Sequence, residues 1–394
     1  MEKTRNTGNS RLGRYEKTAI SGEIVRAYVP PPLPPVPPIQ IGGLLSLLEN
    51  ANRALGKLDG MATILPDKPL FIYMYVRKEA LLSSQIEGTQ SSLSELLLFE
   101  SDQLPTAPTV DVRDVSNYVA ALQHGLMRIR DGFPLSLRLI REIHAALLAD
   151  GRGSDKQPGE FRTSQNWIGG SRPGNATYVP PPHTVALDCL SDLEKFIHAE
   201  TPEIPLLIKA GLIHVQFESI HPFLDGNGRL GRLLITFLLC TAGALNDPIL
   251  YLSLFFKQHR EKYYSLLQEV REQGAWEAWL EFFLTGIIEA SEQATETARK
   301  ILHLFASDRA RLESRGRTAA SAILLLQWMQ RHPVFNIPTA TQALGLSHPT
   351  VSKAVTLLRD EGILRQIDQK RRDRYFVYDA YMAALSQGTE PLPR

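Results

Sequence analysis

The sequence contains 394 residues, so at about 100–200 residues per domain it should form two or three modules. Its 43 Lys and Arg residues and 42 Asp and Glu residues give a net charge of +1, which excludes a wholly basic nucleic-acid coat and an acidic disordered chain. With 43% hydrophobic residues, the chain can bury a sizeable core.

The cysteines and the apolar segments bear on the compartment. Cys189 and Cys240 are too few for a disulfide scaffold or a cysteine-based zinc cluster, and they suit a reducing environment. The first residues lack the apolar segment of a signal peptide. The most apolar run, residues 233–245, is shorter than the roughly 20 residues that a membrane-spanning helix needs. We therefore expect a cytoplasmic protein with no membrane partner.

The amino-terminal region begins with a tail and a proline-rich segment. Residues 1–20 are polar and charged, and we predict that they form a disordered tail. Residues 28–38 read YVPPPLPPVPP and should be extended as polyproline II, because proline has no N–H to donate. This segment could be a ligand for an SH3-type domain. The apolar residues that follow it favour a strap packed over its own domain.

Apolar residues at helical spacing predict a mainly helical chain as far as about residue 313. Gly88 should weaken or end one helix, and residues 151–183, rich in Gly, Pro, Ser and Asn, predict loops with a short hairpin. The charged run 291–313 predicts a bridging helix. The other helices are expected, in chain order, over residues 43–57, 70–98, 114–150 (two helices around Pro134), 185–198 and 204–220.

The carboxyl-terminal segment, residues 317–378, differs from the rest in charge. It holds nine Lys and Arg residues and four Asp and Glu residues, so it carries +5. Helices are predicted over 321–331, 338–344 and 348–361, followed by two short strands around residues 369–373. This order resembles a winged helix-turn-helix. If it binds DNA, the expected contacts are His348, Thr350, Lys353, Arg371 and Arg372. Docking of a protein or dimerisation is the alternative use.

The most informative stretch is HPFLDGNGRLGR, residues 221–232. Gly226, Gly228 and Gly231 fit the G-x-G-x-x-G pattern of dinucleotide-binding folds, but that pattern needs a strand before it. Residues 206–220 instead carry apolar residues at helical spacing, so we reject this interpretation.

The same stretch has the parts of a phosphate site. Residues 226–228, Gly-Asn-Gly, place a tight turn at a helix N-terminus, where free N–H groups and the helix dipole favour anions. Arg229 and Arg232 can reach one side of that helix, and guanidinium groups suit phosphate oxygens. Asp225 could hold Mg²⁺ on a di- or triphosphate, and His221 is placed as a general base. Together these parts indicate phosphoryl or nucleotidyl transfer.

These residues resemble the Fic-domain family, whose signature is H-x-F-x-[DE]-G-N-G-R-x-x-R. The resemblance covers most of residues 110–290 and implies an all-helical core that transfers AMP from ATP to a Ser, Thr or Tyr hydroxyl of a protein target, which could be the protein itself. Every signature position matches, at His221, Phe223, Asp225, Gly226, Asn227, Gly228, Arg229 and Arg232.

The resemblance also implies a role for each residue. His221 would deprotonate the target hydroxyl, and Asp225 would hold Mg²⁺ against the α- and β-phosphates. Gly226, Asn227 and Gly228 would cradle the phosphates, whereas Arg229 and Arg232 would balance the charge of the triphosphate. Some relatives transfer other phosphate-containing groups or remove AMP, and the intact signature favours adenylylation.

Residues 158–182 fit the flap of this family, a hairpin near the active site. An extended peptide can add to an exposed strand edge, which would place a target side chain beside His221. Thr177, Tyr178 and Val179 are the expected edge, and an ordinary loop is the alternative.

A brake is predicted in the second amino-terminal helix. Ser83 and Glu87 lie four residues apart and share a helix face, and Gly88 follows them. This pattern resembles the inhibitory motif [ST]-x-x-x-E-[GN] of many Fic proteins. The resemblance implies that Glu87 pairs with Arg232 and denies that arginine to the γ-phosphate of ATP.

We thus expect a mainly α protein, a Fic helical core with a short β-hairpin flap and a winged helix-turn-helix, working as an autoinhibited adenylyltransferase. The alternative is a DNA-binding regulator whose Fic domain senses a nucleotide, and a homodimer is expected only by analogy. The predicted parts are a disordered tail (1–20), an amino-terminal region with the strap and the inhibitory helix (21–110), the catalytic core (111–290), a bridging helix (291–316), the winged helix (317–385) and a tail (386–394).

Overall fold

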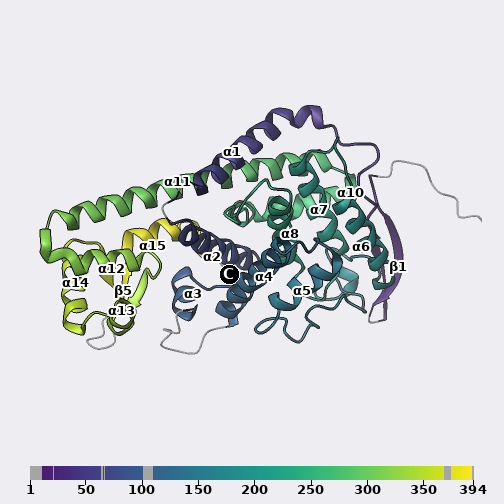
Figure 1. Ribbon diagram of the computed structural model, residues 1–394. Coiled ribbons are helices and arrows are strands. Elements are labelled where there is room, and N and C mark those ends of the chain that lie inside the picture. The colour runs from purple at the N-terminus through teal and green to yellow at the C-terminus, as the bar shows by residue number, and fades with distance from the viewer. Residues whose placement is uncertain are drawn as a thin grey trace, which may run out of the picture.

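The computed structural model describes residues 11–392 except 21, 64, 66, 101–109 and 368–373. Its described part is mainly helical, as predicted, with a small antiparallel hairpin and a three-stranded sheet. The catalytic helices gather at one end and the carboxyl-terminal unit lies at the other (Figure 1). None of the described helices is both long enough and apolar enough to span a bilayer.

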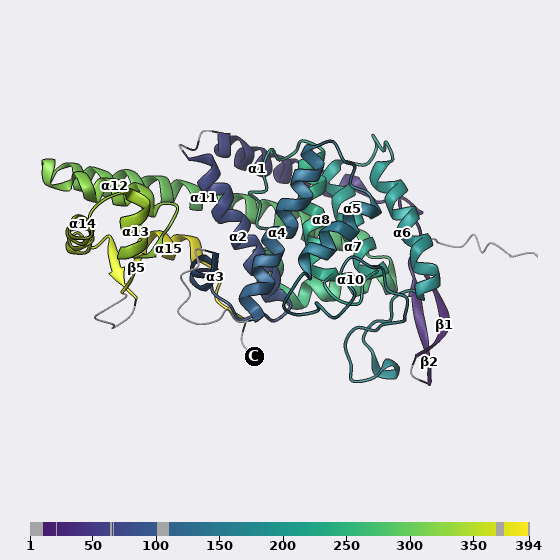
Figure 2. The same ribbon diagram turned by 60° about the horizontal axis from the view of Figure 1, so that its bottom comes forward.

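The amino-terminal hairpin corrects one prediction. Residues 14–20, expected in a disordered tail, form β1 (Arg14–Ile20), which pairs antiparallel with β2 (Glu23–Val29). Ile20, Val25 and Ala27 bury a small apolar cluster against Val179. The polar face of β1 is exposed, and this outward face gives its sequence the character of a tail. The hairpin lies at the edge of the catalytic end (Figure 2).

The proline-rich segment packs against its own domain. Gln216, on a central helix, donates a hydrogen bond of 2.8 Å to the carbonyl oxygen of Pro31. Arg11 bonds the carbonyl oxygens of Pro37 and Pro38 and forms an ion pair of 2.8 Å with Glu277. These contacts agree with the strap interpretation.

The helices of the amino-terminal region include the one that carries the predicted inhibitory motif, residues 83–88. The predicted helix over 70–98 is divided, because Gly88 adopts a positive φ of 95° that favours glycine. A short 3₁₀ helix, η1 (Ile41–Leu44), leads into the first α-helix. The helices are α1 (Leu45–Thr63), α2 (Lys68–Ile86) and α3 (Leu93–Glu100).

The catalytic core is built around α7, a helix that is buried on nearly all sides. It packs against α6, α8, α10 and α11. The two helices predicted around Pro134 are present as α4 and α5. The elements of this region are α4 (Val110–Arg130), α5 (Leu137–Leu147), η2 (Pro173–Asn175), α6 (His183–His198), α7 (Leu206–Ile220), α8 (Asn227–Thr241), α9 (Ser253–Gln258) and α10 (Arg260–Gln273).

The bridging helix is longer than predicted. A single helix, α11 (Trp276–Glu313), includes the predicted segment and the end of the catalytic core. Its one internal glycine, Gly286, does not break it, because Phe255 fills the space where a side chain would stand. The helix runs from the catalytic end to the carboxyl-terminal unit in both views (Figures 1 and 2).

The carboxyl-terminal unit contains the three predicted helices and two predicted strands, in the predicted order. Its sheet order is β3-β5-β4, all antiparallel. The sequence analysis missed β3 and α15. The elements are η3 (Gly316–Ala319), α12 (Ala320–Met329), β3 (Val334–Asn336), α13 (Ile337–Leu344), α14 (His348–Asp360), β4 (Leu364–Gln366), β5 (Tyr375–Tyr378) and α15 (Asp379–Ser386).

Candidate active site

The site is organised by the turn between α7 and α8. His221 follows α7 in the left-handed conformation, with φ 49° and ψ 62°, which is uncommon for a residue other than glycine. Its N–H still donates to the carbonyl oxygen of Phe217 at 2.9 Å. The residue therefore ends the helix and directs the chain into the signature loop.

Asn227 fixes this loop from within. Its Oδ1 accepts from the N–H of Phe223 at 2.9 Å, and its Nδ2 donates to the carbonyl oxygen of Phe223 at 2.8 Å. The Asn227 side chain is buried, so both bonds lie in the core. The side chain of Asn227 is therefore used inside the loop, and its backbone at the start of α8 is the part that lies in the predicted phosphate cradle.

Sequence reasoning missed His144, which supports the loop from α5. Its ring stacks on Phe223 with centroids 3.7 Å apart, and its Nε2 lies 3.0 Å from the carbonyl oxygen of Asp225. Its Nδ1 accepts from the N–H of Gly159 at 2.8 Å. Burial lowers the pKa of His144 to about 4, so the ring is neutral at pH 7.

The start of α8 has the geometry of an anion site. Gly226 has a positive φ of 77° and precedes the first turn, whose N–H groups have no acceptors within the helix. A Cβ at 228 would overlap the Glu87 carboxylate where it pairs with Arg232, so the absence of a side chain at Gly228 leaves room for this ion pair. Arg229 is buried, and its Nε meets no acceptor among the described residues. A phosphate would satisfy these donors.

Asp225 fits the role of a magnesium ligand. Its side chain is 37% exposed, and one carboxylate oxygen accepts from the Gly226 N–H at 2.6 Å and lies 3.8 Å from the guanidinium of Arg229. Its other carboxylate oxygen forms no hydrogen bond with the described residues. The described residues contain no cluster of three or more metal-ligating side chains. A single carboxylate nevertheless suits Mg²⁺, which commonly binds one or two carboxylates together with substrate phosphates and water.

The structure brings the predicted brake residues onto Arg232. The guanidinium donates to the Glu87 carboxylate at 2.8 Å, to the Ser83 hydroxyl at 2.8 Å and to the Ser83 carbonyl oxygen at 2.9 Å. Burial lowers the pKa of Arg232, but the charge and hydrogen bond of Glu87 together with Tyr263 and Tyr264 outweigh this and hold the pKa above its ordinary value. Ser83 and Glu87 thus supply oxygen acceptors that a bound phosphate could otherwise provide. Gly88 ends the helix directly after them.

The surroundings of His221 keep its imidazole in the neutral form. Burial and, after it, the positive charges of Arg162 and Arg271 together lower its pKa to about 3. The ring is therefore neutral at physiological pH, as a general base must be.

The flap differs from the predicted hairpin. Residues 158–182 form loops closed by one antiparallel bridge between Ile168 and Tyr178. Tyr178 and Val179 are buried, and the Val179 carbonyl oxygen accepts from Tyr28 of β2 at 2.9 Å. The prediction of a free edge is wrong for these two residues, because β2 already covers this side. Thr177 is exposed.

The predicted DNA-contact residues that are described lie on one helix. His348 and Lys353 are exposed on α14 and Thr350 is half-buried, whereas the opposite face of α14 is buried. Arg371 and Arg372 lie outside the described residues.

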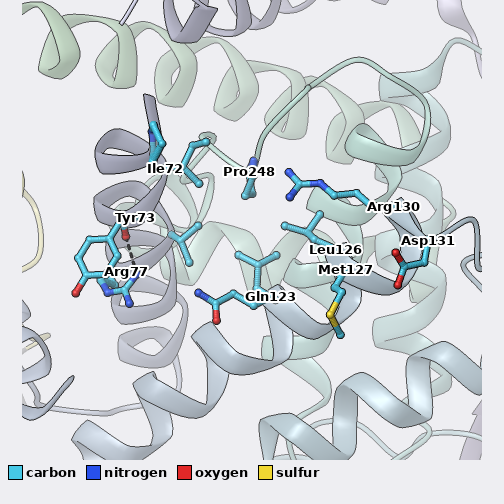
Figure 3. Close-up of a pocket in the computed structure, with 12 residues that line it drawn as sticks. Ile72, Tyr73, Arg77, Gln123, Leu126, Met127, Arg130, Asp131 and Pro248 are labelled. Atoms are coloured by element: carbon cyan, nitrogen blue, oxygen red, sulfur yellow. Dashed lines mark hydrogen bonds between the residues drawn. The ribbon is translucent and has the colours of Figure 1, made fainter. Parts of the chain in front are cut away.

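A cavity of about 640 Å³ lies away from this site, between α2 and α4. Ile72 and Tyr73 of α2, Leu126 and Met127 of α4, and Pro248 surround it (Figure 3). None of the signature residues lines it. The cavity therefore borders the brake helix but is not the candidate active site.

Comparison with known proteins agrees with this geometry. Residues 45–127 match the family described as Fic/DOC family N-terminal, and residues 134–239 match the Fic/DOC family. The protein adenylyltransferase Fic of Culex quinquefasciatus is 35% identical over 139 residues, which are 35% of this chain and 25% of that protein. The protein of the same name from Drosophila melanogaster is 34% identical over 140 residues, again 35% and 25%. The chain spans about a quarter of the length of these relatives.

Two solved structures share the fold. A Fic family protein from Desulfovibrio desulfuricans is 18% identical with a TM-score of 0.57, and the match covers 89% of this chain and 99% of that one. A Fic domain containing signaling protein from Bacteroides thetaiotaomicron is 18% identical with a TM-score of 0.51, covering 64% and 97%.

The two hydrogen bonds between the Asn227 side chain and the backbone of Phe223, here called the clamp, lead to a stability prediction. Asn227→Ala removes two buried hydrogen bonds. It takes away the acceptor of the Phe223 N–H, whereas the Phe223 carbonyl oxygen still accepts from Asn166 at 3.2 Å, so the free energy of unfolding should fall by about 1–3 kcal/mol. Urea unfolding measures this change. Asn117→Ala, which removes one exposed bond to Asp150, is the control and should cost less. Equal stability of the two variants would contradict the clamp.

Proposed function

The chain carries the two adjoining Fic/DOC family regions, and we propose that it is an autoinhibited protein adenylyltransferase that uses ATP and Mg²⁺. One observation carries the proposal. The turn after α7 and the first turns of α8 hold His221, Asp225, Arg229 and Arg232, and Glu87 forms an ion pair with Arg232. The same group of side chains supplies a base, a metal ligand and a phosphate cradle.

The proposed reaction follows from the position of each group. His221 takes the proton of a Ser, Thr or Tyr hydroxyl, and the hydroxyl oxygen forms a bond to the α-phosphorus of ATP. The bond from that phosphorus to the bridging oxygen breaks, and pyrophosphate leaves with the electron pair. Arg229, Arg232 and the N–H groups of α8 bind phosphate oxygens throughout. Mg²⁺ held by Asp225 would neutralise charge on the phosphates.

Autoinhibition follows from competition for Arg232. This guanidinium is only 2% exposed, so it needs an anionic partner at short range. Glu87 supplies that partner in this structure, and the γ-phosphate of ATP is the competing one. With Glu87 in place the triphosphate cannot extend to Arg232, so the α-phosphate is misaligned for attack. A displacement near 1 Å can cost about 100-fold in rate.

Replacing the brake glutamate tests both parts of the proposal. Glu87→Gly should raise the rate of AMP transfer by about 100-fold, because Arg232 becomes available to the triphosphate. His221→Ala in the Glu87→Gly background should abolish transfer, because no base remains. Incorporation of labelled AMP, located by mass spectrometry on Ser, Thr or Tyr, measures both.

The matched control is Glu313→Gly, which removes another glutamate at the end of a helix, far along α11. It should leave the rate unchanged. Equal transfer by the wild type and Glu87→Gly would refute the brake, whereas no transfer by either would refute the adenylyltransferase.

A second candidate function is DNA binding by the carboxyl-terminal unit, which would make the protein a regulator with a nucleotide-sensing Fic domain. The supporting observation is that α14 exposes His348 and Lys353 and buries Val351, Ala354, Val355 and Leu358. An exposed polar face on the second helix of a helix-turn-helix suits a DNA groove. Docking of a protein target is the competing use of this face.

Salt dependence distinguishes these uses. The full chain should bind duplex DNA at 50 mM salt and more weakly at 200 mM, because phosphate contacts release counterions. Lys353→Ala should weaken binding several-fold in fluorescence anisotropy, and Lys300→Ala on α11 should not. Absence of binding at low salt would favour protein docking.

A further inference from the structure

The buried end of α7 must satisfy its last carbonyl groups. A helix leaves its final C=O groups without intrahelical donors, and leaving them unpaired in a core costs free energy. Here the chain also reverses at His221, so the helix cannot continue to supply donors. Side chains from elsewhere in the fold provide them.

Arg162, in the flap, donates to two of these carbonyl groups, those of Ile220 and His221. Its Nε donates to the carbonyl oxygen of His221 at 2.9 Å, and its Nη2 donates to those of Pro181 at 2.5 Å and Ile220 at 3.4 Å. Its backbone N–H donates to the carbonyl oxygen of Pro222 at 2.9 Å. The side chain is buried, so one guanidinium joins both ends of the flap to the turn.

Arg271 of α10 and Tyr178 of the flap complete this arrangement. The Tyr178 hydroxyl donates to the carbonyl oxygen of Ser219 at 2.5 Å, and Arg271 donates to that of Glu218 at 3.4 Å. The Arg271 guanidinium also lies 3.9 Å from the centroid of the Tyr178 ring. Four consecutive carbonyl groups, from residue 218 to residue 221, are thus bonded by side chains.

We propose that Arg162 is a positioning residue, which holds the left-handed turn at His221 and directs the imidazole toward the target hydroxyl. The proposal rests on the proposed function, since it assigns the reaction to His221. Among the described residues, the Arg162 guanidinium donates its hydrogen bonds to backbone oxygens, and this role does not need it to touch ATP or the target.

The charge of Arg162 has a second effect on His221. Burial lowers the pKa of Arg162 to about 10, so it remains protonated at pH 7 and disfavours a second positive charge nearby. The other ionisable groups around the end of α7 are Arg271, Tyr178, Glu218 and Asp225. Loss of the Arg162 charge should therefore raise the pKa of His221.

Two substitutions separate geometry from charge. In the Glu87→Gly background, Arg162→Met should lower kcat by about 10–100-fold and leave the KM for ATP within about twofold, because the phosphate cradle on α8 is untouched. Arg162→Lys keeps the charge but loses the planar fork, so kcat should fall about tenfold. If Arg162→Met does not fold, Arg162→Lys still tests the proposal through kcat.

The protonation state of His221 can be measured by NMR without the catalytic reaction. In protein labelled at histidine, the His221 ring signal, assigned through His221→Ala, should stay at the neutral position from pH 8 to pH 4 in the parent and in Arg162→Lys. In Arg162→Met it should begin to move toward the imidazolium position below about pH 5. This measurement tests the charge effect of Arg162 on His221 even if Glu87→Gly transfers no AMP, a result that would refute the proposed function separately.

Arg141→Met is the matched control. Arg141 also bonds a flap carbonyl, that of Gly159 at 2.7 Å, but within the described part of the chain it makes no hydrogen bond to the end of α7. It should change neither kcat nor the His221 signal. An Arg162→Met or Arg162→Lys variant whose kcat equals that of Arg141→Met would overturn the proposal.

An independent observation concerns the segment after α15, residues 388–392, which returns to the brake helix. Lys257 of α9 donates to the carbonyl oxygens of Gly388, at 3.0 Å, and Glu390, and to Oε1 of Gln85 at 2.7 Å. Gln85 in turn donates to the carbonyl oxygen of Thr389 at 2.7 Å. Gln85 is fully buried on α2, two residues before Glu87.

We infer that this segment is a latch that holds the last turn of α2 against Arg232. Like the brake itself, it rests on the proposed function. Burial lowers the pKa of Lys257 to about 8, so at pH 7 it is mostly charged and can hold the segment and Gln85 together. Displacing the segment leaves Gln85 and Lys257 with fewer partners and loosens the turn that carries Glu87.

Gly388→Val displaces the latch without shortening the chain. Gly388 has a positive φ of 80°, and a Cβ there would lie 2.7 Å from Leu254, so the segment must move. AMP transfer should rise several-fold over the wild type, and the substitution should add nothing in the Glu87→Gly background. Lys257→Met, which removes the shared donor, should have the same effect.

Gln387→Val, at the exposed neighbouring position, is the control and should leave the rate unchanged. If Glu87→Gly is active but Gly388→Val and Lys257→Met are no faster than wild type, the latch is wrong and the brake stands. If Glu87→Gly is itself inactive, the proposed function fails first.

Discussion

The pairing of a buried guanidinium with an anion governs this structure. Arg232 sits almost fully enclosed among core helices, where an unpaired charge would be costly. Ser83 and Glu87 are therefore held against it, and Gly228, which has no side chain, leaves room for the Glu87 carboxylate beside it. The brake contact is consequently part of the folded core. A triphosphate can replace it only by offering an equivalent charge at the same place.

The turn between α7 and α8 imposes a second constraint on the same site. A chain reversal inside a helical core exposes carbonyl groups at one helix end and N–H groups at the other. The fold fills the first set with Arg162, Arg271 and Tyr178, and it leaves the second set, at the start of α8, for phosphate. The end of α7, whose carbonyl groups are bonded by side chains, is therefore the fixed side of the site, and the start of α8 is the side that would bind a ligand.

The sequence predicted the local parts of this arrangement better than the tertiary ones. The signature and the spacing of Ser83 and Glu87 are short patterns, and the structure brings them together as expected. The support from His144 and Arg162 depends on contacts between segments far apart in the chain, which no periodicity reveals. The prediction of a free strand edge at Tyr178 and Val179 was wrong for the same reason. β2 covers this edge, and the hairpin that contains β2 was not predicted because residues 14–20 have the composition of a tail.

The burial of α2 limits how the brake can be released. From Leu70 to Ile86 the helix is buried on most sides, and Glu79 within it bonds Ser253 and Tyr118. Removing the whole helix would expose this apolar surface and unpair Glu79, so it would amount to unfolding the core. The Glu87 side chain, by contrast, is 36% exposed at the helix end. Release must therefore be confined to the last turn, where the segment after α15 also makes its contacts.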